Sequence, residues 1–130
     1  MAFFLLVLAP PVGAGDTVVF KGGDYEFVAL ARLAVFPPDL AQDRVASPGA
    51  PAPGFEFAAV RLKASLIPSA DTPQPDDAVL MADTGPLKCK LVNITCRGEG
   101  CRLTLVFYAP IRAELRQLEL GGTPIRLHSE

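Results

Sequence analysis

The stretch from Lys88 to Tyr108, KCKLVNITCRGEGCRLTLVFY, constrains the fold most, because it has the pattern of a β-hairpin with two cysteines at its tip. If Gly98 and Glu99 form a two-residue turn, Cys96 faces Cys101 across the hairpin. One face is then almost entirely apolar, with the opposed pairs Ile94/Leu103, Val92/Leu105 and Lys90/Phe107. The other face is polar at its tip and apolar at its base, with the pairs Thr95/Arg102, Asn93/Thr104, Leu91/Val106 and Cys89/Tyr108. This pattern predicts a two-layer β domain in which one face packs on a core and the other is partly solvated.

Other segments repeat the strand pattern. Residues 56 to 66 alternate most clearly, with Val60 and Leu62 on one side and Arg61 and Lys63 on the other. A Gly22-Gly23 turn predicts a hairpin of residues 17–20 and 25–28 that sets Phe20 opposite Tyr25 and Val18 opposite Phe27. A second Gly-Gly turn at 121–122 sets Leu118 opposite Ile125 and Leu120 opposite Thr123, and residues 78–82 form a short strand. Residues 29 to 36 fit either a continued strand or a helical turn.

Prolines and glycines mark the connections between these strands. The chain has 13 prolines and 11 glycines, which leave little room for long helices. Residues 37–54 are predicted to connect two sheets, with a helical turn allowed between 39 and 46, and residues 68–77 form a second polar loop. The chain is therefore expected to be an all-β sandwich of seven or eight short antiparallel strands.

The first fourteen residues, MAFFLLVLAPPVGA, differ from the rest in being apolar and uncharged. Their order, an apolar run, a proline pair and small residues, is that of a secretory signal. The run is too short for a spanning helix, so no transmembrane anchor is expected. We expect residues 1–14 to be a signal segment, 15–130 a single domain, and the protein to be secreted or periplasmic. Because no basic residue precedes Lys21, a first strand or a misassigned start is the alternative.

The three cysteines predict a disulfide and a leftover thiol. In an exported protein Cys96 and Cys101 can form a cross-strand disulfide, which closes a short loop and stabilises the fold by about 2 kcal/mol. Cys89 then stays unpaired and is expected to pack beside Tyr108. Zinc bound by all three cysteines and His128 is an alternative with no matching module spacing. Three reduced cysteines in a cytosolic chain are a further alternative.

Asp83-Thr84-Gly85 follows an apolar stretch and looks like the signature of the aspartic proteases. In that family two such aspartates share a proton and activate a water, so a chain of this length would have to dimerise. The sequence departs from the signature at Pro86. A turn that uses Asp and Gly for their backbone preferences explains the triplet equally well.

The remaining candidate sites are weaker. The formal charge of -2 and the absence of a basic run argue against a nucleic-acid partner. The loop acids Asp71, Asp76 and Asp77 lack the ligand spacing of a calcium loop, so no metal or other cofactor is expected. Residues 93 to 95 form a glycosylation sequon on the outer face of the central hairpin. The only histidine, His128, lies next to the terminus, where a catalytic base is not expected.

Three stretches together resemble a bacterial family: residues 54–62 (GFEFAAVRL), residues 80–85 (LMADTG), and residues 105–110 (LVFYAP) followed by 118–120. The family consists of exported domains of unknown function related to the mycobacterial immunogenic secreted sandwich protein. The resemblance covers roughly Val18 to Leu127 and implies an immunoglobulin-like sandwich in an extracytoplasmic setting. The chain departs from the family in lacking its frequent lipid-anchor cysteine and in having the Cys96/Cys101 pair.

The function expected from these features is that of a non-catalytic extracytoplasmic module for interaction, adhesion or envelope association. Its partner would be a protein or a component of the cell envelope, and homo-oligomerisation is open. The alternatives are a homodimeric aspartic protease that uses Asp83 and, if residues 1–14 are no signal, a subunit of an intracellular assembly.

Overall fold

A computed structural model describes residues 17–64, 72–98 and 100–127. The elements are β1 (Thr17–Phe20), β2 (Gly23–Leu33), α1 (Pro38–Gln42), β3 (Phe55–Ala64), the 3-10 turn η3 (Pro75–Asp77), β4 (Ala78–Ala82), β5 (Gly85–Arg97), β6 (Gly100–Pro110), β7 (Leu115–Leu120) and β8 (Thr123–Arg126). All strand pairs are antiparallel. The predicted all-β class is confirmed.

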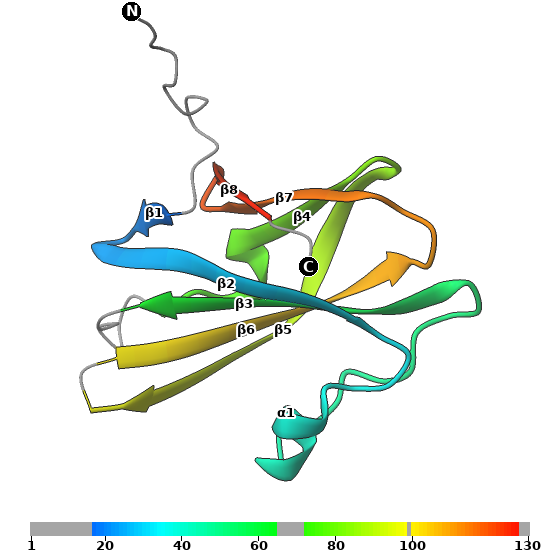
Figure 1. Cartoon of the computed structure of the whole chain (residues 1–130), viewed down its shortest axis with the longest axis horizontal. Helices are drawn as coiled ribbons and strands as arrows, with labels where there is room; N and C mark the ends of the chain where they lie inside the picture. Colours follow the sequence, from blue (N-terminus) through cyan, green and yellow to red (C-terminus); the bar gives the residue numbers. More distant parts are fainter. Residues whose placement is uncertain (1–16, 65–71, 99, 128–130) are drawn as a thin grey trace, which may run out of the picture.

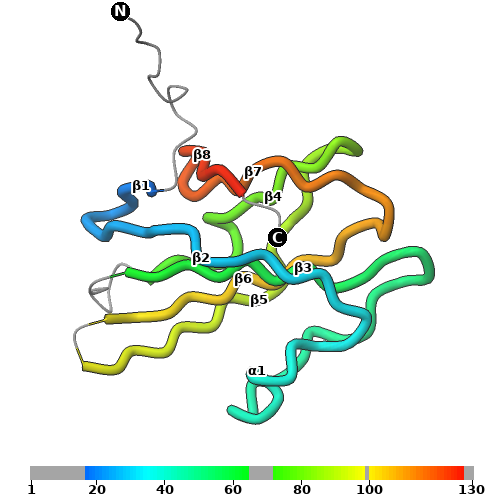
Figure 2. The backbone as a smooth tube through the Cα atoms, viewed as in Figure 1, coloured from blue at the N-terminus to red at the C-terminus, as the bar shows by residue number. Residues whose placement is uncertain are grey.

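The strands follow the order β1-β2-β3-β6-β5-β4-β7-β8, and the long strand β5 belongs to two layers (Figure 1). Its first residues, Gly85 to Lys88, pair with β4, whereas Cys89 to Arg97 pair with β6. The two ends of this order approach one another, since β1 lies next to β8 (Figure 2). A side chain at Gly121, in the turn before β8, would clash with the ring of Phe20. The immunoglobulin-like arrangement stays a prediction.

The main core lies between the layers and takes side chains from every strand. Phe107, Leu105 and Leu103 of β6 are fully buried there, as the pattern of the central hairpin predicted. Alternate residues of β3, Val60 and Leu62 among them, face the same core. The opposite layer contributes the fully buried side chains of Leu80, Leu118, Leu120 and Ile125.

The outer face of the β3-β6-β5 layer carries a second, smaller core. Leu40 of α1 packs on Phe57 and Val106, with Phe36 and Tyr108 against them. The Tyr108 hydroxyl also donates a hydrogen bond of 2.7 Å to the carbonyl oxygen of Gly49. The connection between β2 and β3 therefore covers the apolar base of the hairpin and leaves its polar tip uncovered. This agrees with the predicted split of that face.

Several predicted pairings are confirmed, and two sets are wrong, one in the first hairpin and one in the central hairpin. The opposed pairs from Leu91/Val106 to Cys96/Cys101, and the last hairpin, have the predicted register. The first hairpin turns at Lys21 and Gly22, both with positive φ, so Phe20 pairs with Gly23 and not with Tyr25. The shift is two residues, which keeps every side chain on its predicted face.

The second wrong pairing lies at the base of the central hairpin. A bulge between Cys89 and Leu91 inserts Lys90, so Phe107 pairs with Cys89 and not with Lys90, and Cys89 does not pair with Tyr108. Cys89 therefore lies in the main core, on the face opposite to the predicted one. The expected connection between sheets at residues 37–54 is also wrong, because β2 and β3 are neighbours in one layer. The proline content marked an irregular connection but carried no information on where its two strands pair.

Candidate functional site

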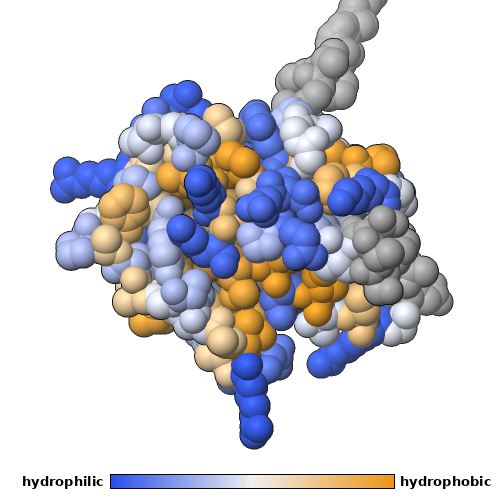
Figure 3. All heavy atoms as spheres, turned by 180° about the vertical axis from the view of Figure 1, so that it is seen from behind, coloured by the Kyte–Doolittle hydropathy of each residue, from blue (hydrophilic) through white to orange (hydrophobic). Residues whose placement is uncertain are grey.

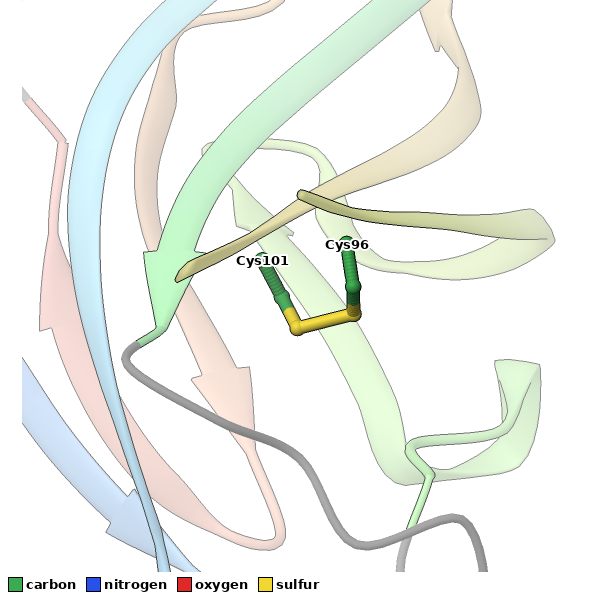
Figure 4. Close-up of a disulfide and its surroundings, with 2 residues drawn as sticks. All are labelled: Cys96 and Cys101. Atoms are coloured by element: carbon green, nitrogen blue, oxygen red, sulfur yellow. A yellow bond between two sulfur atoms is a disulfide. The ribbon is translucent and has the colours of Figure 1, made fainter. Parts of the chain in front are cut away.

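Cys96 and Cys101 form the predicted disulfide at the tip of the hairpin, with a Cα–Cα distance of 4.0 Å (Figure 4). Their sulfur atoms are therefore not available as the thiolate ligands that the zinc alternative needs. Its fourth ligand, His128, lies outside the described residues. In the part of the chain that the structure describes, no group of three His, Cys, Asp or Glu side chains could hold a metal ion.

Cys89 is a buried core residue. Its thiol donates a hydrogen bond of 3.2 Å to the carbonyl oxygen of Leu91, and burial raises its pKa to about 11. A thiol that is inaccessible and protonated at neutral pH is a poor nucleophile. Cys89 thus contributes packing, not reactivity.

Asp83 lies exposed in the two-residue turn between β4 and β5. Its Oδ1 accepts a hydrogen bond of 2.9 Å from the backbone N–H of Glu114, and its own N–H donates to the Glu114 carbonyl oxygen at 2.9 Å. Gly85 follows with φ of 129°, a conformation that favours glycine. The triplet at 83–85 thus ties the turn to the connection between β6 and β7.

Among the acids considered for calcium, Asp77 serves local structure. The Asp77 carboxylate accepts a hydrogen bond of 2.8 Å from the backbone N–H of Gln74 and so caps η3. Asp76 belongs to the same short turn, and Asp71 lies outside the described residues.

A hollow of about 650 Å³ lies on the outer face beside α1, over the polar tip of the hairpin. We call it the basic hollow. Four basic side chains line it from β3, β5 and β6, together with the polar side chains of Asn93, Thr95 and Thr104. The basic residues are Arg61, Lys63, Arg97 and Arg102. On the α1 side the hollow is lined by Asp39 and Asp43.

Two of the four basic residues are neutralised by acids. Arg61 binds both carboxylate oxygens of Asp39, at 2.8 and 2.9 Å, and also donates to the Thr104 hydroxyl at 3.1 Å. These hydrogen bonds hold the pKa of Asp39 below its ordinary value. Lys63 lies 3.6 Å from a carboxylate oxygen of Glu26. Arg61 and Asp39 thus fasten α1 to the sheet.

The other two basic residues, Arg97 and Arg102, have no such neighbour. Among residues 17–64, 72–98 and 100–127, neither makes a salt bridge or a side-chain hydrogen bond, and both are exposed. Arg102 pairs directly with Lys63 across β3 and β6, so two like charges face one another on one side of the sheet. Directly opposed like charges are destabilising, and Glu26 offsets only the charge of Lys63. The four basic residues outnumber the two acids that line the hollow, so it carries an excess of positive charge in a protein whose formal net charge is -2.

Sequence reasoning missed the basic hollow because its charges come from three strands that meet only after folding. The alternation of 56 to 66 placed Arg61 and Lys63 on one side, and the hairpin register placed Arg102 with Thr95. The sequence did not show that β3 and β6 are neighbours in the sheet. The 37–54 connection supplies the two acids of the hollow.

The hydrophobic side chains at the surface form no comparable feature. The side of the molecule in Figure 3 mixes hydrophobic side chains in orange with charged ones in blue. The large apolar side chains that are most exposed, Val19, Val28, Val35, Phe55 and Ile111, come from five different segments. Phe55 and Ile111 are neighbours, since Phe55 pairs with Pro110 and the Ile111 N–H donates to the Gly54 carbonyl oxygen. Single exposed apolar side chains are ordinary for a folded domain.

Comparison with protein-family models, curated proteins and solved structures finds no match for this chain. The resemblance to the exported sandwich family thus stays a prediction. No helix among the described residues is long and apolar enough to cross a membrane.

Proposed function

We propose that the protein is a non-catalytic extracytoplasmic interaction module that binds an anionic partner through the basic hollow. The observation that carries the proposal is the pair of arginines, Arg97 and Arg102, that make no salt bridge within the described chain and line a concave surface beside Lys63. Guanidinium groups bind carboxylates and phosphates with two parallel hydrogen bonds, which suits a partner rich in either group. The Asn93, Thr95 and Thr104 side chains add hydrogen-bonding groups to the same surface.

The extracytoplasmic setting is supported by the disulfide and by the signal-like pattern of residues 1–14. Disulfides form and persist in oxidising compartments and are rare in the cytosol. The non-catalytic character is supported by the engagement of Asp83 with the Glu114 backbone and by the burial of Cys89. Peptide cleavage at acid pH that disappears in Asp83→Asn would contradict it.

The proposal is tested by measuring the affinity of the protein for two labelled polyanions, a polyglutamate peptide and a glycerol-phosphate polymer, by fluorescence anisotropy. The two probes separate a protein-like partner from an envelope polymer. We expect the double variant Arg97→Gln/Arg102→Gln to lose at least about tenfold in affinity, because two charge-assisted contacts are removed. Binding should also weaken as salt is added.

Arg112→Gln is the matched control, since Arg112 is an exposed arginine in the connection between β6 and β7, outside the hollow. We expect it to bind both probes as the wild type does. Absence of wild-type binding to both polyanions, or an equal loss in Arg112→Gln, would refute the proposal.

A further inference from the structure

The tip half of β5 is a strand edge that no described element covers. Beyond Lys88, β5 has β6 on one side and no second neighbour in the strand order, and Figure 1 shows this half at the margin of the sheet. The two terminal strands of the order, β1 and β8, are short and lie next to one another. The edge of β5 is therefore one of two long open edges of the described fold; the other, β2 beyond Glu26, is interrupted by a bulge at Val28.

The backbone groups at this edge belong to alternate residues. The Cα–Cα distance of 4.0 Å between Cys96 and Cys101 identifies them as a non-hydrogen-bonded pair of the β5–β6 ladder. Because hydrogen-bonded and non-hydrogen-bonded pairs alternate, Val92, Ile94 and Cys96 direct their N–H and C=O groups away from β6. These groups form a ready template for another strand.

Natural edges are commonly blocked by charges, prolines or bulges. On β5 the proline, Pro86, and the bulge, at Lys90, lie at its base, and η3 packs against β5. Arg97 is the one charged residue of the tip half. From Leu91 to Arg97 the register with β6 is regular, and the side chains of Val92 and Ile94 are only partly buried at the margin of the core. The tip half is thus open on its backbone and apolar on its inner face.

We infer that the tip half of β5 pairs with β5 of a second copy, antiparallel and centred on Ile94, to form a symmetric dimer. This register pairs all three residues whose backbone N–H and C=O groups point away from β6. Ile94 faces Ile94 of the second copy, and Val92 faces its Cys96. On the inner face every contact is then apolar, and on the outer face Asn93 meets Thr95 of the second copy. Leu91 meets Arg97, so no like charges are opposed. The segment is thus complementary to itself, as a two-fold interface requires.

The dimer would place two basic hollows on the same side of one continuous sheet, because the two-fold axis is perpendicular to the sheet. The inference goes beyond the proposed function and does not depend on it.

Hydrogen exchange of the wild-type protein tests the pairing without a variant. We expect the amides of Ile94 and Cys96 to exchange more slowly as protein concentration rises to about 1 mM. At that concentration even a weak dimer is populated. The amides of Asn93 and Thr95 point toward β6, so their protection should not change. Exchange at Ile94 and Cys96 that is independent of concentration would overturn the inference.

A charge swap at the two-fold position provides the second test. Ile94→Lys and Ile94→Glu each oppose like charges in a homodimer, so each is expected to weaken self-association by at least about tenfold in sedimentation equilibrium. A mixture of the two variants should associate again as a heterodimer. A dimer that persists in Ile94→Lys alone would place the interface elsewhere and overturn the inference.

Discussion

Truncation of Arg32, a half-buried residue on β2, is expected to destabilise the fold more than an ordinary surface substitution. Its guanidinium donates hydrogen bonds to the backbone oxygens of Ala113 (2.6 Å), Pro110 (2.8 Å) and Ile111 (3.1 Å), and to Glu56 Oε2 at 2.6 Å. The Arg32 side chain thus fastens the connection between β6 and β7 to the ends of β2 and β3. The sequence gives no local sign of this role.

The magnitude follows from the number of acceptors and from their access to water. A hydrogen bond to a charged group contributes about 1.5 to 3 kcal/mol when it is buried. The Arg32 side chain is 30% exposed, so water can replace part of what is lost. For Arg32→Met we therefore expect a loss of about 3 kcal/mol in the free energy of unfolding, well below the sum over its four acceptors.

Urea unfolding of the wild type and the variants measures this loss. Arg32→Lys keeps the charge but not the planar fork and should fall between the two. Arg116→Met is the matched control, because the Arg116 side chain is 61% exposed and its ion pair with Glu114 is long, at 3.6 Å. A loss of less than about 0.5 kcal/mol in Arg32→Met, the size of an ordinary surface substitution, would refute the reasoning.

Two further predictions concern ionisable groups. Because the pKa of Asp39 is lowered chiefly by its hydrogen bonds to Arg61, its stabilising contribution is present above the ordinary value of 3.8 and disappears as pH falls through the lowered pKa. The free energy of unfolding of Asp39→Asn should therefore be lower than that of the wild type by less than about 1 kcal/mol at neutral pH, and the difference should vanish in strong acid. A difference that persists at all pH values would contradict this prediction. Cys89, with its pKa raised from 9.0 to about 11, should resist alkylation in the folded protein, and the free energy of unfolding should fall as pH rises past 9.0. Mass spectrometry without reductant should find one alkylated cysteine after denaturation, and rapid labelling of the native protein would contradict the burial.

The strands and the central hairpin could be predicted because local patterns determine them. Alternation in residues 56–66 and the apolar row of Leu103, Leu105 and Phe107 reflect burial on one face, which the sequence records directly. The register at the tip followed from a two-residue turn.

What could not be predicted depends on geometry that local patterns do not encode. The bulge at Lys90 changes the face of Cys89, and a sequence with alternating apolar and polar residues does not mark an inserted residue. The basic hollow requires β3 to lie beside β6, a pairing between strands far apart in the chain. The Arg32 contacts depend on the same long-range placement.

The central claim is that Arg97 and Arg102 form an anion-binding surface. The most direct measurement is an NMR titration of the ¹⁵N-labelled protein with the polyglutamate peptide and with the glycerol-phosphate polymer, which maps binding residue by residue. With at least one of the two, the account predicts shifts at Arg97, Gly100, Arg102 and Thr104 that saturate together, while β7 and β8 stay unchanged. Shifts confined to the β7–β8 layer, or none with either polymer, would contradict it.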